Sequence, residues 1–245
     1  MKMLLTQCKV EILRVFRNPY YIFWSLFMPI VFYFIFTRVV NLDVPDKALW
    51  DAHFLMSMTS FSVMGSAIMT LGIRMVEERS KGWTTFMRVT PLTDTIYFFS
   101  KMIGQSMVHV FSILIIFLAG GLVNGIELTV FEWISSAFWI LLASMPFLAL
   151  GVLVGMMKRV DTAAGVSNII YMILAITGGM YMPFDILPKT VQAIGSWLPA
   201  FHFGNGAWEI IRGNGPEILN IAILAAYLIV FMLLSTYIRR KQEAV

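Results

Sequence analysis

The chain has 245 residues and a formal net charge of +4; 59% of its residues are hydrophobic and only 13% are charged. Soluble domains carry about 25% charged residues, so this composition, with a mean hydropathy of +0.79, excludes an ordinary soluble domain and indicates a membrane protein. The basic residues form no block, which argues against a nucleic-acid partner. Cys8 is the single cysteine, which excludes an internal disulfide and a cysteine-based metal site.

Residues 1–17 predict an amphipathic helix rather than a secretory signal, because charged residues interrupt every apolar run. On a helical projection, the residues that share the apolar face are Leu4, Leu5, Cys8, Ile12, Val15 and Phe16. The other face is mostly basic and polar. This pattern is typical of an interfacial helix that lies among the lipid headgroups with its apolar side in the membrane.

Six apolar segments follow, each close to the about 20 residues that cross a bilayer as a helix. We place them at 20–40, 53–74, 101–123, 133–155, 163–182 and 217–238. Pro29 and Pro146 fall inside the first and fourth segments, where neighbouring helices can tolerate a kink. We therefore predict an all-α, polytopic membrane protein with a single domain over 1–245.

The distribution of basic residues predicts the orientation of the spans. Fourteen of the 18 Lys and Arg residues lie on the side of the amino terminus, and the four on the other side are Arg38, Lys47, Lys189 and Arg212. Because basic residues favour the cytoplasmic side, we predict a multi-pass protein of the cell membrane with both termini in the cytoplasm. The loop after the second span is then cytoplasmic.

Segment 77–91 is the long polar interruption on the predicted cytoplasmic side. Trp83, Phe86, Met87 and Thr90 recur there at helical spacing, and Pro91 ends the pattern. This spacing predicts a short amphipathic helix outside the bilayer. Such a helix either binds a partner or rests on lipid headgroups, and the spacing does not decide between the two.

The predicted outer segment 183–216 contains spaced prolines and glycines between apolar stretches that are too short to span. It predicts a re-entrant hairpin that protein or a water-filled cavity covers. An ordinary extracellular loop is the alternative, and the aromatic residues Trp197, Phe201, Phe203 and Trp208 argue against it.

Few residues indicate chemistry. By these boundaries no Asp, Glu, Lys or Arg lies deep in a span, which argues against a proton relay or an ion-coupled carrier. Gln105, His109 and Ser112 form a polar stripe on the third span, which we interpret as interhelical hydrogen bonding rather than a substrate contact.

Sequence motifs for catalysis are absent. There is no metalloprotease, serine hydrolase or metal-site motif, and no G-x-x-x-x-G-K-[ST]. We therefore predict that the chain is not an enzyme and binds no metal or cofactor itself. If it does ATP-driven work, the phosphate-binding loop lies on another chain.

The topology and two local segments resemble permease subunits of type-2 ATP-binding-cassette exporters, a family that includes drug, antibiotic-resistance and polysaccharide exporters. The first segment is ERSKGWTTFMRVTPLTDTIYFFSK, with an acidic residue and Arg, then Gly, an apolar residue and Pro before the third span. The second is GGMYMPFDILPKTVQAIGSWLPAFHFGNGAWEIIRG, with spaced prolines and a Gly-rich end. The family more often has Thr and Leu where this chain has Trp83 to Phe86, which leaves the choice of partner open.

The resemblance implies that 77–91 is a coupling helix seated in a groove of a separate ATPase subunit, which binds ATP and Mg²⁺. The residues implied in that contact are Glu77, Glu78, Arg79, Gly82, Trp83, Phe86, Met87 and Pro91. It also implies that the amino-terminal helix is a connecting helix. Two permease subunits, identical or different, would form a dimer along their first and fifth spans. Candidates for the substrate path between them are Tyr33, Met64, Asn168, Tyr171 and Thr177.

The function expected from this resemblance is export of an amphiphilic drug, antibiotic or lipopeptide, as in drug efflux and antibiotic resistance. Methionine-rich second and fifth spans favour an amphiphile over the polysaccharide or glycolipid that other exporters of the class carry, although thioethers also fill gaps between helices. An immunity or scaffold protein that works without ATP, and a membrane-embedded enzyme, are the alternatives from other classes.

Overall fold

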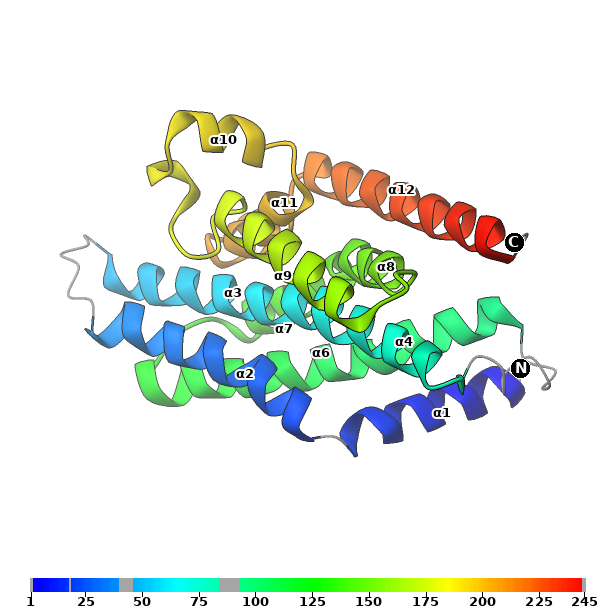
Figure 1. Cartoon of the computed structure of the whole chain (residues 1–245). Coiled ribbons are helices and arrows are strands. Elements are labelled where there is room, and N and C mark those ends of the chain that lie inside the picture. The colour runs from blue at the N-terminus through cyan, green and yellow to red at the C-terminus, as the bar shows by residue number, and fades with distance from the viewer. Residues whose placement is uncertain (1, 18, 40–45, 84–92, 244–245) are drawn as a thin grey trace.

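The computed structural model describes residues 2–17, 19–39, 46–83 and 93–243, and in these ranges every regular element is helical. Figure 1 shows the arrangement. The first half contains α1 (Lys2–Phe16), α2 (Pro19–Phe34), η1 (Ile35–Val39), α3 (Lys47–Gly65), η2 (Ser66–Thr70), α4 (Leu71–Ser80) and α6 (Asp94–Asn124). The second half contains α7 (Val130–Ala143), α8 (Met145–Val154), α9 (Val160–Thr177), η3 (Phe184–Ile186), α10 (Lys189–Gly195), α11 (Pro199–Ile211) and α12 (Ile218–Glu243).

Five helical stretches in the described ranges are long and apolar enough to cross a membrane. They are Lys47–Ser80, Ile96–Asn124, Val130–Val154, Val160–Thr177 and Ile218–Lys241. These stretches correspond to the second to sixth predicted spans. The predicted first span is represented by a shorter apolar helix, Ser25–Val39, so the total of six spans stays a prediction.

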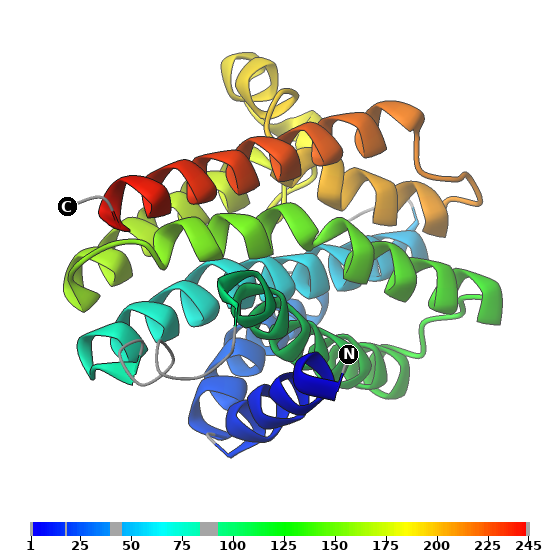
Figure 2. The ribbon, with the colours of Figure 1, turned by 90° about the vertical axis from the view of Figure 1, so that its right-hand side faces the viewer.

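The core is built around the continuous helix that α3, η2 and α4 form. Every residue from 51 to 68 is buried, and α2, α6, α8, α9 and α11 pack against this helix (Figures 1 and 2). Asp46 begins it, because its side chain accepts a hydrogen bond from the backbone N–H of Leu49 at 3.0 Å. The apolar second span is therefore the centre of the molecule.

The π-helical turn η2 lies in the middle of this central helix, where α8 approaches it most closely. A Cβ atom at Gly151 of α8 would lie 2.1 Å from the carbonyl oxygen of Ala67 in η2, so glycine is required for the two backbones to come this near. The fourth predicted span breaks between α7 and α8, with Pro146 in the first turn of α8. Proline is tolerated there because its missing N–H has no partner in a first turn.

Segment 183–216 folds into η3, α10 and α11 rather than a regular span. α11 is largely buried against α3, α7, α9 and α12, and the Trp208 indole N–H donates to the Ser57 hydroxyl at 3.0 Å. In α10 and the turn after it, Ile194 and Trp197 are exposed. The aromatic residues of the segment thus include anchors in the core, and its assignment as a re-entrant hairpin stays a prediction.

One end of the bundle gathers several segments that are distant in the sequence. The start of α1, the end of α4 and the end of α12 lie toward the same side in Figure 1, while α10 lies toward the opposite side. α1 packs against α6. We call this the inner end, because the predicted topology places it in the cytoplasm.

Candidate functional site

A group of charged side chains is buried at the inner end, where α1, α4 and α6 meet. Lys101 of α6 is 0% exposed, and its Nζ lies 2.7 Å from Glu11 Oε1 of α1 and 2.7 Å from Glu78 Oε1 of α4. Arg14 Nη1 lies 3.0 Å from Glu78 Oε1, and the Tyr97 hydroxyl donates to Glu78 Oε2 at 2.9 Å. We call Glu11, Arg14, Glu78, Tyr97 and Lys101 the ion cluster.

The ion cluster fixes the relative positions of its three helices. An isolated buried charge costs several kcal/mol, whereas here each charge has an opposite charge close by. Removing one partner of a buried pair costs about 3–5 kcal/mol, because it leaves an uncompensated charge. If one of α1, α4 and α6 moves, the other two therefore either move with it or lose their ion pairs to it.

The structure corrects the predicted start of helix 77–91. Glu77, Glu78 and Arg79 belong to the last turn of α4, which continues the second span without a break and ends at Ser80. Gly82 then adopts a φ of +74°, a left-handed conformation that glycine takes without strain. The remaining predicted residues Phe86, Met87 and Pro91 lie outside the described residues.

The described part of 77–91 contacts three neighbouring elements. Arg79 donates to the carbonyl oxygens of Gly155, at 2.9 Å, and Met157, which joins α4 to the connection between α8 and α9. The Arg14 guanidinium lies 5.0 Å from the centroid of the Trp83 ring, a cation–π contact. Glu77 pairs with nearby Lys81 at 3.7 Å. Glu78 alone of this group enters the ion cluster.

Sequence reasoning missed Glu11, Tyr97 and Lys101. It placed Lys101 at the inner boundary of the third span, whereas α6 begins at Asp94, about two turns earlier. Lys101 is therefore a charged residue buried within the apolar stretch Ile96–Asn124, close to its inner end rather than deep in the span. The sequence did contain a signal that Glu11 has a specific partner, since it is the single acidic residue in 1–17.

The face that α1 buries also differs from the prediction. Cys8, Glu11 and Val15 are buried, while Leu5, which the projection placed on the apolar face, is 63% exposed. The reason is that α1 packs its Cys8 face against α6, so a carboxylate paired with Lys101 takes a position that the hydropathy pattern assigns to an apolar side chain. Burial raises the pKa of the Cys8 thiol, and nearby Glu11 raises it further.

Gln105, His109 and Ser112 are all fully buried on α6. The Gln105 amide donates to the Ser66 hydroxyl at 2.5 Å, and His109 Nδ1 lies 3.3 Å from the Ser144 hydroxyl between α7 and α8. Two of the three thus make interhelical hydrogen bonds, as that interpretation expects, while the Ser112 hydroxyl has no partner among the described residues. Among the same residues no group of His, Cys, Asp and Glu is placed to hold a metal ion.

The five candidates for the substrate path do not line one surface in this structure. Tyr33 and Met64 are fully buried, and Tyr33 accepts a hydrogen bond from Asn124 at 2.7 Å. The Tyr171 hydroxyl donates to the Phe61 carbonyl at 3.2 Å. Asn168 is exposed and Thr177 half-exposed on α9. Asn168 and Thr177 thus lie on the open part of α9, whereas Tyr33 and Met64 are enclosed in the core.

Comparisons with known proteins agree with this architecture. Residues 47–237 match the family described as ABC-2 family transporter protein. Over 245 residues, the full length of both chains, the sequence is 60% identical to the "Putative transport permease YvfS" of Bacillus subtilis (strain 168). The family match runs from α3 into α12, so it includes Glu78 and Lys101 of the ion cluster and leaves α1 outside.

Proposed function

The chain belongs to the ABC-2 family of transporter permeases, and from that premise we propose that it is the membrane subunit of an exporter driven by a separate ATPase. The chain contains no G-x-x-x-x-G-K-[ST] sequence, so a second subunit supplies the phosphate-binding loop. That subunit binds ATP and Mg²⁺ and hydrolyses the nucleotide at the cytoplasmic side.

The ion cluster is the observation that carries this proposal. Segment 77–91 begins in the last turn of α4, where Glu78 is paired with Lys101 of α6 and Arg14 of α1. A movement that the ATPase imposes on 77–91 is therefore transmitted to α1 and α6 together. Because packed helices switch between discrete arrangements, the result is alternating access between an inward-facing and an outward-facing state.

The ATPase contact lies on the segment that follows α4. Trp83 is partly exposed, and its ring is held at one side by Arg14. Phe86 and Met87 follow Trp83 in the sequence, and aromatic and methionine side chains are of the type enriched at the centre of protein interfaces. Gly82, with its left-handed backbone, is the point at which the chain turns after the end of α4.

A second permease subunit completes the transport path along α2 and α9. The open face of α9 contains Ile169, Met172, Ile173 and Ile176 with the polar Asn168 among them. Met182 is exposed just after this helix. Flexible thioethers beside aliphatic side chains suit varied apolar surfaces, so the exported compound is an amphiphile of the drug, antibiotic or lipopeptide type.

Reconstitution with a cognate ATPase tests the proposal. In proteoliposomes, an amphiphilic substrate should stimulate ATP hydrolysis, and Gly82→Pro or Phe86→Asp should abolish export and weaken co-purification of the ATPase without affecting membrane insertion. Lys189→Gln, on the exposed surface of α10 at the opposite end, is the matched control and should behave as the wild type. Normal export in both Gly82→Pro and Phe86→Asp would refute the coupling role.

A further inference from the structure

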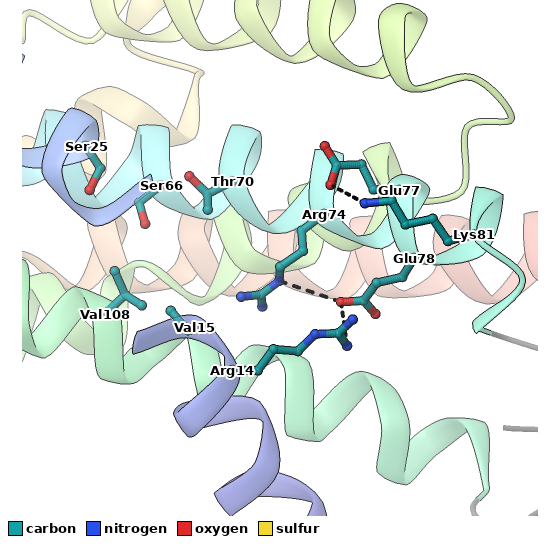
Figure 3. A pocket seen from close by; sticks show the side chains of 10 residues that line it. All are labelled: Arg14, Val15, Ser25, Ser66, Thr70, Arg74, Glu77, Glu78, Lys81 and Val108. Atoms are coloured by element: carbon teal, nitrogen blue, oxygen red, sulfur yellow. Dashed lines mark ion pairs between the residues drawn. The ribbon is translucent and has the colours of Figure 1, made fainter. Parts of the chain in front are cut away.

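A cavity of about 190 Å³, lined by several charged side chains, lies beside the ion cluster, between α1, α2, the central helix and α6. Figure 3 shows its lining. Five of the lining side chains are charged: Arg14, Arg74, Glu77, Glu78 and Lys81. Three hydroxyl side chains, Ser25, Ser66 and Thr70, line it as well. A cavity with this lining is suited to a polar ligand rather than to an acyl chain.

Arg74 is the unusual member of this lining. Its side chain is only 15% exposed, and the ion pair from its Nε to Glu78 Oε1 is long, at 4.0 Å. Both Nε and one terminal nitrogen of its guanidinium are buried without a hydrogen-bond partner among the described residues. Buried guanidinium groups are normally hydrogen-bonded, so Arg74, which lines the cavity, has donors to spare.

The carboxylates near Arg74 are already occupied by other groups. Glu78 is shared by Lys101, Arg14 and Tyr97, and Glu77 pairs with Lys81. Among the residues that the structure describes, three basic and two acidic side chains line the cavity, which leaves one excess positive charge. The charges of the adjacent Lys101 and Glu11 cancel each other. The lining therefore has both the charge and the free donors to bind an anion.

The cavity lies at the level of the inner headgroups. The helix Lys47–Ser80 has 34 residues, which is about 50 Å at 1.5 Å per residue and exceeds the hydrocarbon thickness of about 30 Å. Trp50 is of the type found at membrane interfaces, and about 20 residues beyond it the helix reaches Thr70. Arg74 lies one turn further on, where phosphate groups of the inner leaflet are found.

We infer that this cavity binds the phosphate of an anionic phospholipid from the inner leaflet. Arg74 and Arg14 extend into it from α4 and α1 (Figure 3), and guanidinium groups bind phosphate oxygens in a bidentate manner. Lys81 is largely exposed, and the hydroxyl side chains of Ser66 and Thr70 line the cavity on the membrane side. Basic pockets between membrane helices on the cytoplasmic side are suited to such headgroups.

Binding to the purified full-length chain in detergent tests the inference without an ATPase or a substrate, so its outcome is independent of the proposed transport function. The probes are phosphatidylglycerol, phosphatidylcholine with the same acyl chains, and inorganic phosphate. Phosphatidylglycerol should raise the unfolding temperature and remain bound in native mass spectrometry, whereas phosphatidylcholine should do neither. Equal effects of the two lipids would overturn the inference.

Arg74→Gln is the decisive variant. It removes a guanidinium that is only loosely paired, so Glu78 keeps three other partners and folding is retained. The variant should lose about tenfold or more in affinity for phosphatidylglycerol, as expected for a lost charge-assisted contact. Wild-type affinity in this variant would overturn the inference.

Two further variants separate site binding from general charge effects. Lys81→Gln, at a side chain that is 76% exposed and cannot affect the core, should weaken binding by less than Arg74→Gln. Arg159→Gln, at an exposed arginine outside the cavity, should change nothing; an equal loss there would overturn the inference.

Inorganic phosphate distinguishes the two sources of the same chemistry. If inorganic phosphate at millimolar concentration competes with phosphatidylglycerol for binding, the site recognises the oxyanion itself. If phosphatidylglycerol binds and phosphate does not compete with it, the site takes the headgroup of a membrane lipid. Binding of neither probe would overturn the inference.

Discussion

At the scale of single residues, Lys101 contributes more to the stability of the fold than its position near the end of a predicted span suggests. It is fully buried between Glu11 and Glu78, so its removal leaves two carboxylates close together with Arg14 as the nearest remaining cation. The charge balance of the cluster, rather than packing alone, then limits stability.

Lys101→Met should lower the free energy of unfolding by about 3–5 kcal/mol, measured by thermal unfolding in detergent. Adding Glu11→Gln should restore part of the loss, because one of the orphaned carboxylates is removed. Lys158→Met, at an exposed lysine near the same end, should stay within about 0.5 kcal/mol of the wild type. Strictly additive losses in the double variant would show that the two residues are not coupled.

Gly151 is a second residue whose effect follows directly from a distance. A methyl group there would lie 2.1 Å from the Ala67 carbonyl oxygen, and a backbone atom cannot move away as a side chain can. Gly151→Ala should therefore destabilise the protein by about 1–3 kcal/mol, seen as a lower unfolding temperature.

Gly165 of α9 is the matched control, because a Cβ there meets nothing within 4 Å. Gly165→Ala should be neutral or stabilising by up to about 1 kcal/mol, since alanine is the better helix former. If both alanine variants behaved alike, the close approach of α8 to η2 would not be a determinant of stability.

At the scale of elements, the docking of α1 on α6 can be followed through the single cysteine. Cys8 is buried in this contact, and burial, with a contribution from Glu11, raises the pKa of its thiol. Because the thiolate is the reactive form, maleimide labelling should be slow at pH 7–8, and its rate should still be rising above the pH at which a free thiol has fully ionised.

Gly104→Leu should increase the labelling rate severalfold. A Cβ at Gly104 would already lie 3.0 Å from Glu11 Cβ, so a larger side chain separates α1 from α6. Leu5→Ala, on the exposed face of α1, should leave the rate unchanged. Slow labelling in Gly104→Leu would show that α1 is held by contacts other than this one.

The sequence allowed the helices to be predicted better than their contacts. Hydropathy located the five long stretches because each is a nearly continuous apolar run, and Pro146 marked the break in the fourth. The predicted coupling helix begins too early, because the charges of Glu77 to Arg79 indicate a position outside the bundle. Glu78 is in fact buried by partners from α1 and α6. Such pairing depends on residues that are distant in sequence, which periodicity does not show.

The π-helical turn and the buried face of α1 could not be predicted for the same reason. Nothing in the sequence of Ser66–Thr70 distinguishes it from an α-helical stretch, and the turn is recognised by its backbone hydrogen bonding, as from the Leu71 N–H to the Ser66 carbonyl oxygen. Glu11 breaks the hydropathy pattern of α1 and is buried because Lys101 lies opposite. The composition of each helix was informative, whereas the pairing of charges between helices required the structure.

At the scale of the whole molecule, the two most open helices differ in chemistry. The exposed face of α12 is aliphatic over most of its length, as at Ile221, Ile229 and Leu233. α9 instead exposes the polar Asn168 among aliphatic residues. Because polar side chains are unfavourable against lipid tails, the open face of α9 is the better candidate for a protein contact.

Cysteine cross-linking tests this assignment in membranes. In a Cys8→Ala background, Ile173→Cys on α9 should form a disulfide-linked dimer under mild oxidation, while Leu233→Cys on α12 should remain monomeric. Both positions are about equally exposed in the single chain, so accessibility alone cannot produce the difference. Cross-linking through Leu233→Cys and not through Ile173→Cys would move the subunit contact to α12.

The turn at Ser66–Thr70 also decides which side chains of the central helix face its neighbours. A π-helical turn contains one residue more than an α-helical turn, and one residue corresponds to a rotation of about 100° in an α-helix. If the turn became α-helical with the same sequence, Glu78 would therefore rotate away from Lys101. Deleting one residue within the turn would instead leave Glu78 opposite Lys101, because the turn would then close as a regular α-helical turn with both halves of the central helix still in phase.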